Sequence, residues 1–156
     1  MEEHATALAD AIEAALPGWV ERSVARTAEG YFGQVDPHVM AAAVEAGRRA
    51  RDDVGPRVRA LLEADIDDQR TTPLSLLRGA VRYPTGVLRD AGVPPVERDK
   101  IQTRLFPDDV YDLAPATFAD VHPSLAEVGL AWGAAKAFVH LQRHGKGGGG
   151  STGERP

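Results

Sequence analysis

Three arginines stand close together in the stretch "LLRGAVRYPTGVLRDAG", Leu76 to Gly92. Arg78, Arg82 and Arg89 are four and seven residues apart, so on a continuous helix they share one flank within about 40°. Paired guanidinium N–H groups bind carboxylates and phosphates, which suits such a strip to an anion or to an acidic protein surface. The alternative is a solvated flank whose arginines pair with Asp90 or with acidic loop residues nearby.

Pro84 decides whether this strip is straight. Proline lacks an N–H, and its ring clashes with the carbonyl four residues earlier, which here belongs to Ala80. Tyr83, which precedes the proline, is biased away from helical angles. We expect a break in the helix, after which a new helix carries Pro84 in its first turn. Arg89 then leaves the strip, and the site contracts to two arginines beside a free Ala80 carbonyl and the Tyr83 hydroxyl.

A second pair of cations lies in an apolar helix near the C-terminus. Lys136 and His140 are the long polar side chains in its middle, and both lie within about 60° of its two interior glycines. They either reach solvent beside a packed helix or face a groove that the glycines leave open. In the second case an anionic ligand would bind in a cleft lined by Arg78, Arg82, Lys136 and His140.

Acidic residues gather in a proline-rich loop before this helix. Asp108, Asp109, Asp112 and His122 are weaker metal candidates, because closely spaced carboxylate oxygens can bind Mg²⁺ or Ca²⁺. The loop lacks calcium-loop spacing and a turn glycine, and helix capping or turn initiation accounts for aspartates beside prolines. We therefore predict neither a metal nor another cofactor. Nucleophile motifs such as G-x-S-x-G and a strand-linked phosphate loop are also missing, which favours a non-enzyme without deciding the question.

The elements that would position these residues are helices. Apolar residues recur at helical spacing through nearly the whole chain, and no run of alternating β-branched residues argues for a strand. Pro17-Gly18 should end the first helix, and Gly55-Pro56 should break or kink a later one. Asp36-Pro37 and Thr72-Pro73 have the cap-then-proline pattern of helix starts, and Gly92 has that of a helix end. We predict an irregular all-α domain of about six or seven helices.

The helix from about Pro123 to His144 is apolar on most sides. Two faces run along it, with Leu125, Val128, Trp132, Ala135 and Val139 on one and Leu130, Ala134, Phe138 and Leu141 on the other. Such a helix is usually covered by several neighbours, so we place it, buried, at the centre of the domain. Its small residues, four apart, predict a tight crossing. The domain then spans 1–144, and the glycine-rich residues 145–156 form a disordered tail.

Composition limits the class of protein. The chain has 156 residues, of which 43% are hydrophobic and 26% charged, as in one soluble globular domain. A net charge of −5 argues against a general nucleic-acid coat, and no apolar run approaches the roughly 18 to 20 residues of a membrane span. Cysteine is absent, which excludes disulfides and thiolate chemistry. The acidic, amphipathic N-terminus is unlike a signal peptide, so we expect a cytoplasmic protein.

One resemblance covers about the last 75 residues before the tail. Leu74 to Asp99, together with "FPDDVYDLAPATFADV" and "LAWGAAKAFVHLQR", resembles a family of small uncharacterised proteins from high-GC bacteria. That family carries no assigned activity. The resemblance therefore implies a stand-alone soluble protein and adds no catalytic residue.

These observations favour a non-catalytic cytoplasmic protein that acts through a protein partner, with the arginine strip and the acidic loop as docking residues. The alternative is a small enzyme or sensor that binds an anionic ligand in the cleft described above. Direct binding to nucleic acid ranks third. Association with further copies of the chain stays open.

Overall fold

The computed structural model describes residues 2–64 and 71–148, with side chains as far as Arg143. Seven helices lie in this part of the chain: α1 (Glu2–Phe32), α2 (Pro37–Glu63), α3 (Pro73–Gly79), α4 (Arg82–Asp90), α5 (Lys100–Leu105), α6 (Phe118–Val121) and α7 (Ser124–Gly148). The described residues contain no strand. The predicted all-α class is confirmed.

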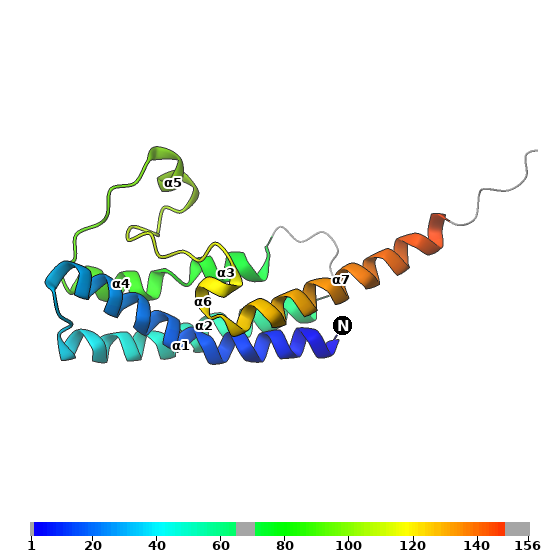
Figure 1. The fold of residues 1–156 in the computed structure, drawn as a ribbon, viewed down its shortest axis with the longest axis horizontal. Coiled ribbons are helices and arrows are strands. Elements are labelled where there is room, and N and C mark those ends of the chain that lie inside the picture. The colour runs from blue at the N-terminus through cyan, green and yellow to red at the C-terminus, as the bar shows by residue number, and fades with distance from the viewer. Residues whose placement is uncertain (1, 65–70, 149–156) are drawn as a thin grey trace, which may run out of the picture.

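α1 and α2 form a long antiparallel hairpin that supplies most of the core (Figure 1). The Asp36 carboxylate accepts the N–H of His38 at 2.7 Å, and Pro37 is the first residue of α2, which confirms the predicted start. Buried residues recur every three or four positions along most of each helix, so one continuous stripe of each faces the other.

The predicted helix end at Pro17-Gly18 is wrong, and of the break or kink predicted at Gly55-Pro56, the break is not found. Pro17 lies within α1 and Pro56 within α2, and each helix continues through its proline. The buried stripe runs on across each proline; Leu16 and Trp19, for example, are buried on either side of Pro17. Packing along a stripe of this length outweighs the roughly 3 kcal/mol that an interior proline costs.

Gly47 allows α2 to come very close to α1. A Cβ atom at this position would lie 2.9 Å from the carbonyl oxygen of Pro17 and 3.0 Å from its Cα. Further along the hairpin, Arg59 of α2 reaches the carboxylates of Asp10 and Glu13 on α1, at 2.6 Å and 3.1 Å. The hairpin is thus held by close backbone packing at its middle and by ion pairs on its flank.

The predicted break before Pro84 is confirmed. α3 ends at Gly79 and α4 begins at Arg82, so Pro84 lies in the first turn, where its missing N–H interrupts no helical hydrogen bond. The Ala80 carbonyl is not free as we expected, because it accepts the N–H of Tyr83 at 3.1 Å. The carbonyl that loses its helical partner at the break is thus hydrogen-bonded within the turn between the two helices.

The predicted boundaries of this helical pair are also confirmed. Thr72 and Ser75 form a reciprocal capping box at the start of α3, with Pro73 as its first residue. Gly92 follows α4 with a φ of 83°, in the left-handed region that glycine adopts without strain.

The place of α7 differs from the prediction. Its N-terminal half packs on α1 and α6, where Leu125 and Gly129 are buried, while its C-terminal half projects past the start of α1 (Figure 1). The central helix is α1, which contacts α2, α4, α6 and α7. A buried C-terminal helix is therefore not confirmed. The physical reason is length, since α7 extends beyond the end of the helix on which it packs.

Two further details of α7 bear on the predictions. A Cβ at Gly129 would lie 2.8 Å from the Phe118 ring, so the expected tight contact exists there, but nothing lies within 4 Å of one at Gly133. The helix continues to Gly148, four residues past the predicted domain end at 144. The rest of the predicted tail, 149–156, lies outside the described residues.

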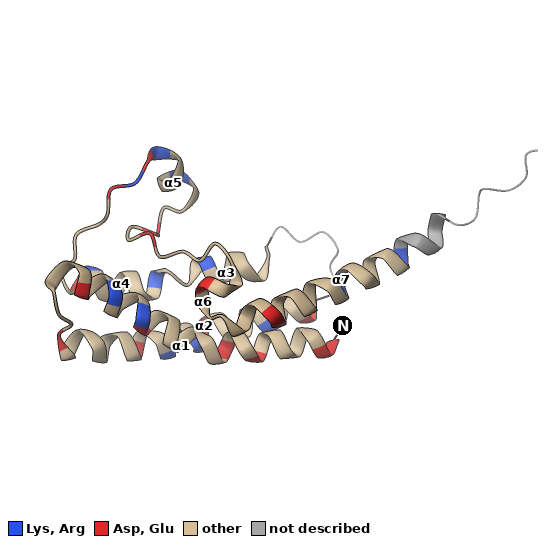
Figure 2. Ribbon diagram, in the orientation of Figure 1, with Lys and Arg blue, Asp and Glu red and all other residues tan. Residues whose placement is uncertain are grey.

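Charged side chains are distributed unevenly over this fold. Figure 2 shows acidic residues at the start of α1 and a long stretch of α7 that is almost free of charge. Between Glu127 and Arg143, the only Asp, Glu, Lys or Arg is Lys136. The projecting part of α7 therefore carries few charged residues.

Candidate functional site

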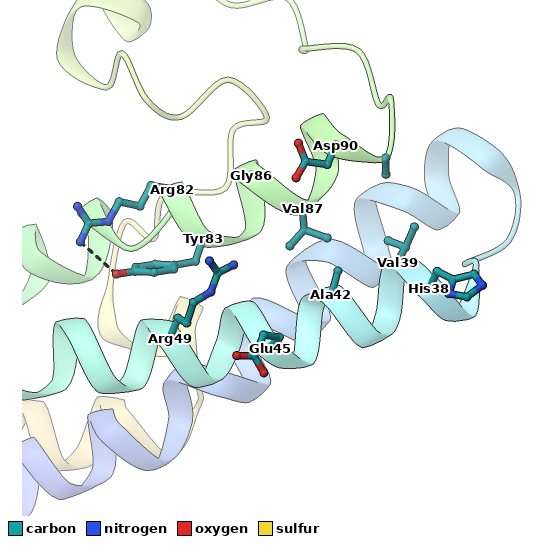
Figure 3. Close-up of a pocket in the computed structure, with 11 residues that line it drawn as sticks. His38, Val39, Ala42, Glu45, Arg49, Arg82, Tyr83, Gly86, Val87 and Asp90 are labelled. Carbon is teal, nitrogen blue, oxygen red and sulfur yellow. Dashed lines mark hydrogen bonds between the residues drawn. The ribbon is translucent and has the colours of Figure 1, made fainter.

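A groove of about 760 Å³ lies between α2 and α4 (Figure 3). Small and apolar side chains line its middle, among them Val39, Ala42 and Val87. Its charged lining residues are Glu45, Arg49, Arg82 and Asp90, and His38 lines it as well. The groove thus combines an apolar floor with cations and acids from both helices.

Tyr83 joins the two helices at one end of this groove. Its hydroxyl donates to Asp53 Oδ2 at 2.6 Å and accepts from Arg82 Nη2 at 3.1 Å. The Arg82 guanidinium also lies 5.1 Å from the centre of the Tyr83 ring, and Figure 3 shows Arg49 reaching toward the same residue. The hydroxyl is engaged, which corrects our expectation of an available polar group. Burial, and next the hydrogen bond to Asp53, raise the pKa of Tyr83.

We expect Tyr83→Phe to lower stability by about 1 kcal/mol at pH 7, because the bond to Asp53 is lost. It should also change the alkaline limb of the stability profile. The pKa of Tyr83 is higher in the folded chain than its ordinary value of 10.0. The tyrosine therefore stabilises the fold fully below pH 10, and this contribution is lost as the pH rises through the folded-state pKa.

Urea unfolding between pH 7 and pH 11 measures this effect. The decline above pH 10 should be shallower in Tyr83→Phe than in the unmodified chain. It should not vanish, since burial also raises the pKa of Tyr111. Tyr31→Phe, at an exposed tyrosine, is the matched control. An alkaline limb identical in Tyr83→Phe and in the unmodified chain would contradict the assignment.

The predicted arginine strip is divided by the structure. Arg78 donates from Nε to the Pro115 carbonyl at 3.0 Å and from Nη2 to the Ala116 carbonyl at 3.2 Å. It therefore anchors the loop before α6 on α3 and lines a different, smaller hollow of about 300 Å³. Arg89 is exposed at the end of α4 and lines neither hollow. Of the three, only Arg82 belongs to the groove.

Lys136 and His140 lie on the projecting part of α7, and the structure does not bring them together with Arg78 and Arg82. Both are exposed, and the Lys136 Nζ stands 5.1 Å from the centre of the Trp132 ring. In Figure 1 this part of α7 runs away from α3 and α4. The hollows that hold Arg78 and Arg82 contain neither residue.

Asp109, one of the weaker metal candidates, has a structural role. It is 2% exposed, and its two carboxylate oxygens accept the N–H groups of Leu113 at 2.6 Å and Ala114 at 2.8 Å. Its backbone carbonyl accepts a hydrogen bond from Arg98, which also donates to the carbonyl groups of two other residues. No residue spacing in the sequence predicts the bonds of the Asp109 carboxylate or the bond of its carbonyl to Arg98.

The other candidates of this group are not gathered around a common point. His122 Nδ1 accepts the N–H of Ser124 at 3.1 Å and so caps the start of α7. Asp108 and Asp112 are exposed, and Asp112 has a φ of 58°. Over the described ranges, no group of three or more His, Asp or Glu side chains is placed to hold a metal ion.

A second candidate surface is the outer face of α7, formed by Leu130, Ala134, Phe138 and Leu141. Leu130 is 74%, Phe138 61% and Leu141 68% exposed. These residues share one side of the helix within about 80°, opposite the side that packs on α1. Sequence reasoning found this face but assigned it to the core, since periodicity alone does not show whether a neighbour covers it.

Comparison with protein-family models, with curated proteins and with solved structures finds no match to this chain. The resemblance to a family from high-GC bacteria therefore stays a prediction. Among the described residues, no helix combines the length and the apolarity that crossing a bilayer requires.

Proposed function

We propose that this protein is a non-catalytic interaction protein that acts through a protein partner, and that the outer face of α7 is its docking surface. Exposure supports the proposal, because Leu130, Phe138 and Leu141 each leave well over half of their surface in solvent. Contiguous apolar patches of several hundred Å² usually mark binding sites. This surface replaces the arginine strip as the docking site, since Arg78 and Arg82 both have partners within the chain.

Phe138→Glu tests the proposal in an affinity purification from cells that express the chain. A buried aromatic anchor often contributes 2 kcal/mol or more to an interface, so the yield of the bound partner should fall at least about tenfold. Ile101→Glu is the matched control, because Ile101 is 71% exposed on α5 and its replacement introduces the same charge elsewhere. Capture of the same proteins in the same amounts by Phe138→Glu would refute the proposal.

An anionic ligand in the groove between α2 and α4 is the second candidate function. It is favoured by Arg49 and Arg82, which come from different helices and line one groove. It ranks below the first because Glu45 and Asp90 line the same groove and offset the two arginines.

A further inference from the structure

We infer that the outer face of α7 binds the same face of a second copy of this chain, with the two helices antiparallel about a two-fold axis. The inference rests on the proposed function, because it names the partner of the surface assigned there. It is argued from the shape of α7, from the distribution of charge along it and from the apolar area that it exposes.

The projecting part of α7 has the shape that such a pair requires. Because it extends beyond the body of the molecule, a second copy can lie along it with its own body at the opposite end (Figure 1). A two-fold interface needs a surface that complements itself, and an apolar stripe meets that condition. With the axis between Ala134 and Ala137, Leu130 faces the partner's Leu141, and the alanines allow the two helices to approach closely.

Charge favours this pairing. Lys136, the only Lys, Arg, Asp or Glu in the middle of this segment, lies on the other side of the helix over the Trp132 ring, so the interface does not bury it. After Glu127, the charged residues of α7 are all basic. In an antiparallel pair the basic tip of one α7 therefore meets the start of the partner's α7, whose first turn carries Glu127. A parallel pair would bring like charges together.

The exposed area is sufficient for a weak dimer. Leu130, Phe138 and Leu141 together expose on the order of 400 Å² in each copy, and the alanines between them bring the total for two copies to roughly 1,000 Å². Specific interfaces begin near this size, and those at the lower end are weak. We therefore expect a dissociation constant on the order of 10 μM.

Sedimentation equilibrium of the purified full chain, from about 1 to about 200 μM, tests for the dimer. The average mass should rise with concentration from 16.7 kDa toward twice that value. Phe138→Glu should weaken association at least tenfold, and Ile101→Glu should leave it unchanged. Circular dichroism of Phe138→Glu shows whether the fold is intact, which we expect because this side chain is exposed.

Disulfide trapping tests the relative direction of the two helices. Because the chain has no cysteine, every disulfide formed involves an introduced residue. In the antiparallel pair, the two copies of residue 130 are about 16 Å apart, too far for a disulfide, whose Cα atoms lie within about 7 Å. Leu130→Cys alone and Leu141→Cys alone should therefore remain uncrosslinked. A mixture of the two chains, one carrying a mass tag, should form the mixed disulfide.

Three results would overturn the inference: a single-chain mass up to 200 μM, a dimer that Phe138→Glu leaves intact, or efficient crosslinking of each cysteine variant with itself. None of them decides the proposed function, which depends on the affinity purification. If that purification yields a different protein whose capture Phe138→Glu abolishes, the docking surface stands and only the second copy is rejected as its occupant.

Discussion

Replacing Gly47 with alanine should lower the free energy of unfolding by about 2 kcal/mol, although glycine is a poor helix former. The added Cβ would lie 2.9 Å from the Pro17 carbonyl oxygen and 3.0 Å from its Cα. Both atoms belong to the backbone of α1, so no side-chain rotation relieves the contact and the helices must separate. Overpacking of this kind costs about 1–3 kcal/mol, which exceeds the roughly 1 kcal/mol gained by replacing a helical glycine.

Gly86→Ala is the matched control for this prediction. Gly86 lies inside α4, and nothing stands within 4 Å of a Cβ built on it. The same substitution should therefore raise stability, by up to about 1 kcal/mol, because only the helix propensity changes. Urea midpoints of the two variants should shift in opposite directions. A rise in the midpoint of Gly47→Ala would show that the α1–α2 contact is looser than the structure indicates.

Asp109→Ala should cost about 3 kcal/mol. It removes a buried carboxylate that accepts two backbone N–H groups, those of Leu113 and Ala114, at 2.6 Å and 2.8 Å. Hydrogen bonds to a charged group contribute about 1.5–3 kcal/mol each, and both donors would be left without their partner. Asp109→Asn keeps the shape and one oxygen acceptor, so we expect an intermediate loss.

Chemical unfolding measures the total loss, and hydrogen exchange at Leu113 and Ala114 shows where it arises. Those two amides should exchange at least tenfold faster in Asp109→Ala, since their protection depends on the carboxylate. Asp108→Ala, at the exposed neighbouring position, should change stability by less than about 0.5 kcal/mol. Unchanged exchange at both amides would mean that the carboxylate does not hold this loop.

The local features of the fold were predictable where a few adjacent residues determine them. Asp36-Pro37 and Thr72-Pro73 start helices, and Gly92 follows the end of one, because side-chain caps, a fixed φ and a left-handed φ act over two or three residues. The break ahead of Pro84 follows from the same short-range geometry. The predicted breaks at Pro17 and Pro56 are not found, because packing along a long buried stripe outweighs the free-energy cost of each proline. A prediction from adjacent residues does not include that packing.

The candidate site was predictable only in part. Arg82 and Tyr83 were identified, but Asp53, which accepts the hydrogen bond of Tyr83, is distant in the sequence. Arg49 was not among the predicted site residues, although it lines the same groove. In the sequence Arg78 and Arg82 are equivalent. In the structure the guanidinium group of Arg78 binds the backbone carbonyls of residues 115 and 116, and that of Arg82 does not. Side chains that meet through tertiary contacts leave no spacing signal in the chain.

By itself, the sequence determined the all-α class, the capped helix starts and the two apolar faces of the last helix, because periodicity and capping are properties of short segments. Only the tertiary structure decided which of those faces is buried. An apolar face is covered only when another element packs on it, and α1 and α6 pack on the opposite side of α7. The face that indicated a core helix is for this reason exposed, and it is now the surface at which we expect the protein to bind.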